Sequence, residues 1–277
     1  MLRRQLGAEL RRLRDRAQRT VAHVAKELRW SESKLSRIET ANSGIRNPDL
    51  EKLLTLYAVE GKERVRLLAL ATQARQRAWW EAYGDVLPDA YETYIGFEAE
   101  ATSIFTYEAQ VVPGLLQTAE YTSAIMQAEL ADDRPEIIGP RIAVRMARQA
   151  VLERDPPPRF GAVLDEDVLR RPIGGPDVLR RQMLRLVEAS ERPTITLQVL
   201  PFSVGAHRGL AGSFMVLEFA GDFGQPLVYC DGMTGGVFRS KPEELRSYLM
   251  SFEALRGAAL SPKDSVELIA KIASGDS

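Results

Sequence analysis

The stretch that decides the fold of the first part of this chain is Trp30–Glu39, with the sequence W-S-E-S-K-L-S-R-I-E. Ser31 predicts a helix start, because a serine hydroxyl there can accept a hydrogen bond from an N–H of the first turn. Leu35 and Ile38 are three residues apart and therefore share the inward face. The other side chains are left to point outward: Glu32, Ser33, Lys34, Ser36 and Arg37. A small helix with such an outer face suits the DNA major groove, where base edges offer donors and acceptors.

A second helix-sized run, T-V-A-H-V-A-K-E-L, precedes this stretch and starts at Thr20. Its inward positions recur at helical spacing and are Val21, Val24, Ala25 and Leu28. Only Arg29 and Trp30 separate the run from the next helix. Two short helices joined by so tight a turn form a helix-turn-helix unit, in which the second helix reads the DNA. The alternative is an exposed amphipathic helix without a ligand, since short polar helices are common.

The residues around this unit predict three more helices. The first helix is indicated by Leu6, Leu10, Leu13 and Ala17, at spacings of four, three and four. After a polar loop that ends at Arg46, Asn47 and Pro48 are typical of the N-cap and first position of a fourth helix. Gly61 separates this helix from a fifth. Residues 1–78 are therefore predicted to form an all-α domain of five helices.

In the order and spacing of these helices, residues 6–70 resemble the Cro/repressor-type (XRE) helix-turn-helix domain. The resemblance implies a DNA-binding surface made of Thr20, Ser31, Glu32, Ser33, Lys34, Ser36, Arg37, Arg46 and Asn47. Glu32, Ser33 and Arg37 fall at its base-reading positions. Arginine can bond both acceptors of guanine and glutamate can accept from cytosine N4, and each such contact discriminates by about 1–3 kcal/mol.

Other positions of this surface are implied to hold phosphates, which set affinity and its salt dependence. These are Thr20, Arg46 and Asn47, while Lys34 and Ser36 are placed to contact either bases or phosphates. The chain also departs from the family pattern at two positions. Val21 stands where many members have a phosphate-binding glutamine. Arg29 stands in the tight turn where many have glycine, and a left-handed conformation there costs a non-glycine residue about 1 kcal/mol.

The net charge of −1 hides a strong asymmetry along the chain. Residues 1–78 contain 18 Lys+Arg and 9 Asp+Glu, so their charge is 18 − 9 = +9, and the remainder carries −10. A basic segment joined to an acidic body is typical of a nucleic-acid-binding head on a regulatory domain. A solvated face of an arginine-rich protein is the alternative.

Residues 79–96 are predicted to connect two domains. Trp79, Trp80 and Tyr83 form an aromatic group that we expect to pack against the second domain, and a stacking platform for single-stranded nucleic acid is the alternative. Residues 97–277 are predicted to form an α+β domain for regulation and dimerisation. Its Glu98–Glu153 part is expected to be mainly helical, with Thr118 as a cap, and Pro156–Pro158 ends it.

Beyond residue 158 the sequence alternates between strands and helices. In T-I-T-L-Q-V-L, apolar Ile195, Leu197 and Val199 alternate with polar residues, which predicts a strand with one buried face. Further strands are predicted at Arg159–Leu164, Ser213–Phe219 and Leu227–Cys230. Helices are predicted at Pro176–Ser190, Pro242–Leu255 and Pro262–Ala273, the last behind the capping Ser261.

A second resemblance covers this part of the chain. Its motifs are W-W-E-A-Y-G-D-V-L-P (79–88), Y-I-G-F-E-A-E-A (94–101), V-V-P-G-L-L-Q-T-A-E-Y (111–121), R-M-A-R-Q-A-V-L-E-R-D-P-P (145–157), V-L-D-E-D-V-L-R-R-P-I-G-G-P (163–176) and T-L-Q-V-L-P-F-S-V-G-A-H (196–207). They are similar to the C-terminal domain of actinobacterial regulators of the WhiJ-like, antitoxin-like type. The resemblance implies a small partner protein of the BldB-like type, encoded by a neighbouring gene.

Nothing in the sequence favours an enzyme or a metal site. Cys230, Asp231 and His207 have the chemistry of a nucleophile, an orienting acid and a base, but their spacing does not support catalysis. No cluster has metal-ligand spacing, and Gly174-Gly175-Pro176 is better explained as a turn and helix cap than as a phosphate-binding loop. We therefore expect no catalysis, no metal and no cofactor. The 200–213 segment is either the lip of a pocket for a ligand or partner or a plain loop.

A single cysteine fits a reducing cytosol, the start of the chain does not have the pattern of a signal peptide, and no run approaches the roughly 20 apolar residues of a membrane span. We expect a cytoplasmic, homodimeric regulator that binds double-stranded DNA in sequence-specific fashion, most simply as a repressor, and senses a partner protein or ligand through its second domain. The alternative is an antitoxin-like protein that mainly restrains a small partner and binds DNA secondarily.

Overall fold

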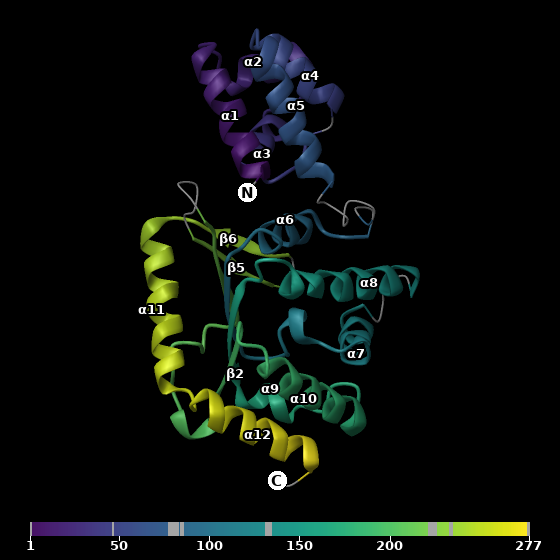
Figure 1. Ribbon diagram of the computed structural model, residues 1–277, viewed down its shortest axis with the longest axis vertical. Helices are drawn as coiled ribbons and strands as arrows, with labels where there is room; N and C mark the ends of the chain where they lie inside the picture. Colours follow the sequence, from purple (N-terminus) through teal and green to yellow (C-terminus); the bar gives the residue numbers. More distant parts are fainter. Residues whose placement is uncertain are drawn as a thin grey trace. The chain divides into compact units, whose positions relative to one another are not determined.

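The computed structural model describes residues 2–45, 47–76, 83, 86–130, 135–220, 226–232 and 235–275. The chain divides into two compact units, Met1–Ala82 and Tyr83–Ser277, and each is described by itself (Figure 1). Within the described residues, no helix combines the length and the apolar character needed to cross a bilayer. Arg46, Trp79 and Trp80 lie outside the described residues, so the structure does not address what the sequence predicts for them.

The first unit is helical in its described part. Its elements are α1 (Leu2–Arg16), α2 (Val21–Leu28), α3 (Glu32–Glu39), α4 (Asn47–Leu56) and α5 (Gly61–Gln76). This confirms the predicted all-α class. The helices α2 and α3 begin where their caps predict, because Thr20 and Ser31 are extended and accept N–H bonds from the following turn.

The core of the first unit gathers apolar side chains from all five helices. Leu10, Leu35 and Leu53 are fully buried in it together with Val24. A glycine allows two of the helices to approach closely, because a Cβ at Gly7 of α1 would lie 2.7 Å from the carbonyl oxygen of Glu39 in α3. The contact between α1 and α3 is therefore a backbone contact that leaves no room for a side chain.

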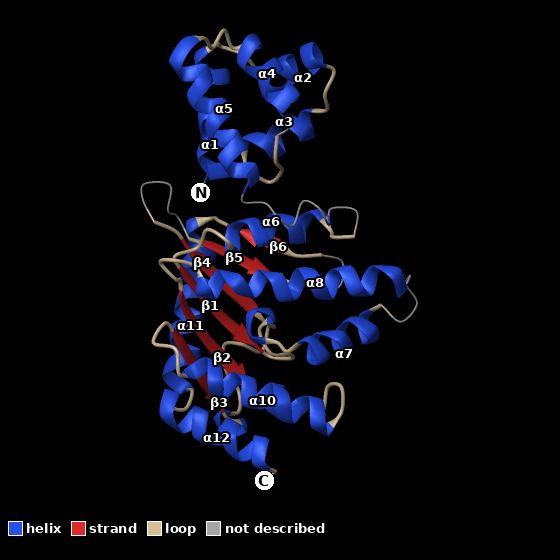
Figure 2. Ribbon diagram, turned by 45° about the vertical axis from the view of Figure 1, so that its right-hand side comes forward, coloured by secondary structure: helices blue, strands red, loops and turns tan. Residues whose placement is uncertain are grey.

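The second unit is built on a six-stranded mixed sheet with the order β3-β2-β1-β4-β5-β6 (Figure 2). The strands are β1 (Ser103–Glu108), β2 (Arg159–Asp165), β3 (Ile195–Leu200), β4 (Phe214–Glu218), β5 (Leu227–Cys230) and β6 (Val237–Arg239). β1, β2 and β3 are mutually parallel, whereas β4 to β6 continue the sheet in antiparallel fashion from β1. The change of direction at β1 brings the carboxyl ends of β1, β2, β3 and β5 to one edge.

Helices cover both faces of this sheet. Most of them lie on one face, where Figure 1 shows α8 and α10; this group is α6 (Asp89–Glu98), α7 (Ala119–Glu129), α8 (Ile138–Arg148), α9 (Glu166–Arg170) and α10 (Pro176–Ser190). The helix α11 (Pro242–Ala258) runs along the other face, over a core that includes Tyr107, Phe214 and Phe252. The helix α12 (Pro262–Ser274) packs against α10 and β3. Short 3₁₀ turns are η2 (Gly114–Leu116), η3 (Pro135–Ile137), η4 (Gln149–Glu153) and η5 (Phe202–Val204).

The α+β class of the second domain is confirmed, with two differences from the expectation. The Glu98–Glu153 part is mainly helical as expected, but it also contains the central strand β1, which the sequence did not predict. The strand at Ile195–Leu200 was expected to bury one face, yet Gln198 and Leu200 on its other face are also buried. Gln198 is satisfied there because its Nε2 donates to the carbonyls of Arg256 and Leu260, at 3.2 and 2.9 Å.

Candidate nucleic-acid interface

The turn between α2 and α3 is built by two caps and one strained residue. The Thr20 Oγ1 accepts from the N–H of His23 at 3.2 Å, and the Ser31 Oγ accepts from the N–H of Lys34 at 3.1 Å. Between the helices, Arg29 has φ 56° and ψ 41°, which is the left-handed conformation that glycine adopts without cost. The turn therefore places a non-glycine residue, Arg29, in a strained left-handed conformation.

The outer face of α3 is polar and exposed. Glu32, Ser33, Ser36 and Arg37 are all exposed, whereas Leu35 and Ile38 are buried in the core of the unit. Ser31 and Thr20, which cap the two helices, are also exposed. Five of the residues that the sequence predicts to contact DNA are thus exposed together at α3, and Thr20 is exposed at the start of α2; their contacts with DNA stay a prediction.

Lys34 differs from its neighbours on α3, because it is half-buried and engaged within the unit. Its Nζ lies 2.8 Å from the Asp49 Oδ2 of α4 and 4.0 Å from the centre of the Trp30 ring. The ammonium group therefore has an ion pair and a cation–π contact at once. The sequence had placed Lys34 simply as a base or phosphate contact, and it gave no signal of this pairing.

A buried ion pair fixes α3 against α1. Arg14 donates from Nε and Nη2 to the two carboxylate oxygens of Glu39, at 2.7 and 3.0 Å, and both side chains are at most a tenth exposed. These bonds raise the pKa of the Arg14 guanidinium above its ordinary value. The phenol of Tyr57 is close enough to feel both charges, and burial raises its pKa. The last turn of α3 is therefore held by a bidentate pair.

A smaller charged cluster flanks the start of α2. Arg19 forms an ion pair with Glu27, and the Nε2 of His23 lies 3.4 Å from the same carboxylate. Thr20 stands between these residues at the end of the helix where a phosphate would be attracted by the helix dipole. At α4, Asn47 is the first helical residue rather than the N-cap, and its side chain lies outside the described part, as does the whole of Arg46.

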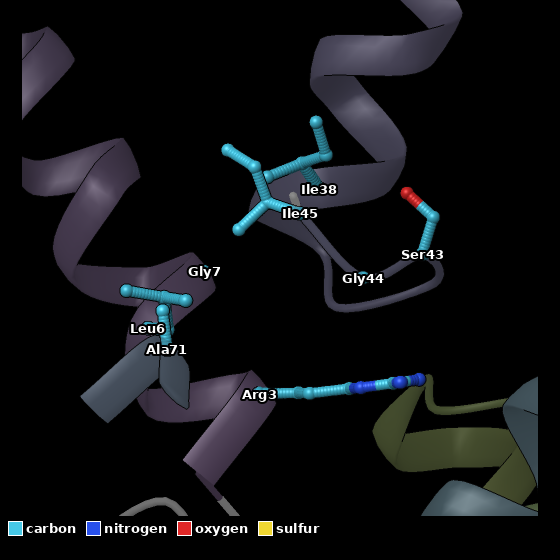
Figure 3. A pocket seen from close by; sticks show the side chains of 8 residues that line it. All are labelled: Arg3, Leu6, Gly7, Ile38, Ser43, Gly44, Ile45 and Ala71. Atoms are coloured by element: carbon cyan, nitrogen blue, oxygen red, sulfur yellow. The ribbon is translucent and has the colours of Figure 1, made fainter. Parts of the chain in front are cut away.

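A small cavity lies where α1, the end of α3, the following loop and α5 meet (Figure 3). It is lined by Arg3, Leu6, Gly7, Ile38, Ser43, Gly44, Ile45 and Ala71, and its volume is about 20 Å³. A water molecule needs about 10–15 Å³ by this measure. The cavity therefore has room for about one water molecule.

In the second unit, the residues considered for a nucleophile and its base have other partners. The His207 Nε2 lies 3.6 Å from the Asp165 Oδ2, and its Nδ1 accepts from the N–H of Gly209 at 3.2 Å. Cys230 instead donates its S–H to the hydroxyl of Tyr248 at 3.4 Å. Within the described residues, no group of three or more His, Cys, Asp or Glu could hold a metal ion.

Two buried polar networks, which the sequence did not predict, tie the second unit together. In the first, Arg148 of α8 donates from Nε and Nη2 to Glu98 of α6, at 2.8 and 2.7 Å. In the second, side-chain amides satisfy the buried Val112–Gln117 segment, where Gln117 donates to the carbonyl of Val112 and Gln182 to that of Leu116. Both networks use residues of the motifs that carry the second resemblance.

Glu108, the last residue of the central strand β1, lies where its negative charge is disfavoured. Burial at the end of β1 raises the pKa of Glu108 to about 7, although hydrogen bonds from Thr106 and Ser213 and the charge of Arg145 oppose the shift. The Thr106 hydroxyl donates to the Glu108 Oε1 at 2.9 Å. Asp231, at the end of β5, adds a repulsion that raises the pKa further.

Comparison with known protein families matches residues 5–67 to a helix-turn-helix domain and residues 91–271 to a domain of unknown function, DUF5753. No curated protein and no solved structure gives a significant match. The first match coincides with α1 to α5 and supports a DNA-binding regulator. The second covers more than half of the chain and nearly all of the described second unit. The chain therefore belongs to the DUF5753 family, and in it a helix-turn-helix domain precedes the family's domain.

Proposed function

We propose that this protein is a homodimeric transcriptional regulator that reads a specific DNA sequence through α3 and responds to a partner or ligand through its second domain. The observation that supports the reading step is the exposed polar row Glu32, Ser33, Ser36 and Arg37, on a helix whose other face is fixed by Leu35 and by the Arg14–Glu39 pair. Two copies would present α3 about 34 Å apart, one DNA turn, and would require a near-palindromic site.

The test is a titration of the full chain against its own upstream DNA and against unrelated DNA, at several salt concentrations. Specific binders prefer their site by about 10³-fold or more. Arg37→Ala is expected to weaken specific binding about tenfold or more and non-specific binding much less, because it removes a base contact. Arg256→Ala, at an exposed pair of the second unit, is the matched control. Equal losses on both DNAs would remove Arg37 from base reading, and no preference by the unaltered chain would refute specific recognition.

A loop of the second unit supports a role in partner binding. Residues 201–213 connect β3 to β4, and within them Phe202 and Leu210 are 56% and 71% exposed. The loop is nevertheless fixed, because the N–H of Phe202 donates to the Glu166 Oε2 at 3.0 Å and Gly209 packs on the ring of Tyr107. We propose that these two apolar side chains, presented by a fixed loop, contact the partner.

The second candidate function is therefore an antitoxin-like protein whose main task is to restrain a small partner of the BldB-like type, as the resemblance to WhiJ-like regulators implies. Co-purification with the product of the neighbouring gene separates the two. Release of the chain from DNA when the partner is added supports the regulator, and a stable complex indifferent to DNA supports the second candidate. We include no catalysis in either proposal, because His207 and Cys230 are engaged with different partners.

A further inference from the structure

Lys34 connects three elements of the first unit. It lies in the first turn of α3, its partner Asp49 lies in the first turn of α4, and Trp30 lies in the turn between α2 and α3. The Nζ reaches Asp49 at 2.8 Å and the Trp30 ring at 4.0 Å. Trp30 itself packs against the core of the unit. The ammonium group is thus a link between the reading helix, its preceding turn and the next helix.

The same contacts disfavour a phosphate contact by Lys34. The Asp49 side chain is only 21% exposed, so a lysine that left it for DNA would abandon a carboxylate with little access to water. Asp49 is also favoured where it stands, because a negative charge in the first turn complements the helix dipole. A pair of opposite charges contributes no net attraction to phosphates, so it should not enter the salt dependence of binding.

We infer that Lys34 is a positioning residue for DNA reading, and that the Trp30–Lys34–Asp49 cluster sets the rotation of α3 against α4. The inference rests on the proposed function. Arg37 is one turn beyond Lys34, and Glu32 and Ser33 directly precede it, so a rotation of α3 moves every base-reading side chain at once. Base contacts discriminate only when they are well aligned. The cluster therefore controls specificity without touching the DNA.

The test uses the full chain and DNA duplexes that the unaltered chain selects from a random pool, with an unrelated duplex as reference. Lys34→Met keeps an apolar stem over Trp30 and removes the charge, and Asp49→Asn removes the partner. Each variant is expected to lower the ratio of specific to non-specific affinity by about tenfold, which is comparable to the loss of one aligned base contact. The salt slope of non-specific binding should stay unchanged in the double variant Lys34→Met/Asp49→Asn, which removes both charges of the pair.

Two further readouts separate positioning from a merely structural role. The charge-exchanged double variant Lys34→Glu/Asp49→Lys restores the pair and should recover most of the specificity ratio. A new selection with Lys34→Met should yield relaxed base preferences, whereas a head that is only less stable would select the same sequence with a smaller active fraction. Failure of the double variant to recover the ratio, or an unchanged selected sequence, overturns the inference.

A direct phosphate contact by Lys34 would give a different set of results. If Lys34 contacts phosphate in competition with Asp49, Asp49→Asn will tighten binding to both duplexes, and Lys34→Met will weaken both equally and reduce the salt slope by about 1. That result overturns the positioning role and leaves the proposed function intact. If the unaltered chain selects no sequence from the pool, the proposed function itself fails.

Discussion

Removal of one partner of the buried pair between Arg14 and Glu39 should strongly destabilise the first unit. The perturbation is Arg14→Ala, which removes both bonds to Glu39 and two further bonds from Nη1, to the Asp15 carboxylate at 2.7 Å and to the carbonyl of Arg19 at 2.9 Å. It leaves the Glu39 carboxylate, only 4% exposed, without its cation. Asp15 loses much less, because its side chain is 58% exposed and water replaces the arginine.

The magnitude follows from this burial. Removing one partner of a buried ion pair costs about 3–5 kcal/mol, because the other charge stays desolvated. A unit of this size is stabilised by only about 4–11 kcal/mol in total. The substitution should therefore bring the first unit close to unfolding while the second unit stays folded. We expect a loss of about 4 kcal/mol in the free energy of unfolding of the first unit.

Hydrogen exchange on the full chain measures this loss separately for each unit. Amides of α1 and α3 should exchange at least 100-fold faster in Arg14→Ala, and amides of β2 and β3 should keep their rates. The matched control is Arg12→Ala on the same helix, where a 64% exposed arginine pairs with Glu9 and Glu63 and its loss costs at most about 1 kcal/mol. Equal effects of the two substitutions would refute the importance of the buried pair.

Three other substitutions test further points of the structure. Gly7→Ala should cost the first unit about 1–3 kcal/mol, because its Cβ would meet the backbone of α3, and an unchanged urea midpoint would refute the close approach. Arg29→Gly should raise stability by up to about 1 kcal/mol by relieving the left-handed strain, and a loss would refute that strain. Glu108 has a pKa raised from 4.5 to about 7, so the folded state favours the protonated carboxyl group. The stability that this group contributes to the second unit is fully present below pH 4.5 and is lost as the pH rises through about 7. Glu108→Gln should therefore stabilise the second unit by up to about 3 kcal/mol at pH 8 and by less than about 1 kcal/mol at pH 5, and an equal effect in urea titrations at both pH values would refute the raised pKa.

Local signals in the sequence predict the first unit well. A cap such as Thr20 or Ser31 acts on N–H groups three residues away, and the inward spacing of Leu35 and Ile38 needs only one helix to be recognised. The N-terminal ends of α2 and α3 follow from these capping signals. Contacts between helices do not, because Lys34 meets Asp49 across 15 residues and Arg14 meets Glu39 across 25. A single sequence does not distinguish a charged side chain that is exposed to solvent from one that is paired within the fold.

The central strand of the second unit, β1, was not predicted from the sequence, and the reason is physical. β1 is buried on both faces, so Ile104 and Tyr107 are equally inside although they point to opposite sides. Without alternation between apolar and polar residues, a short buried run cannot be told from part of a helix. The outer strand β3 was recognised because Thr196 is exposed and interrupts the apolar run. Alternation therefore located β3 and did not reveal β1, whereas β2, whose residues 160–164 are all buried, was predicted without alternation.

The motifs of the second domain bear on where the proposed partner or ligand would bind. Glu98 and Arg148 come from two motifs and meet in a buried pair, and Gln117 lies within another motif at 2% exposure. Side chains so buried hold the fold together, and a partner cannot reach them unless the unit opens. These buried motif residues therefore belong to the architecture, whereas the choice of the proposed partner or ligand should depend on exposed residues, of which Phe202 lies in another motif. We propose Phe202 and Leu210 of the 201–213 loop for that choice, because they are 56% and 71% exposed while the N–H of Phe202 is held by Glu166.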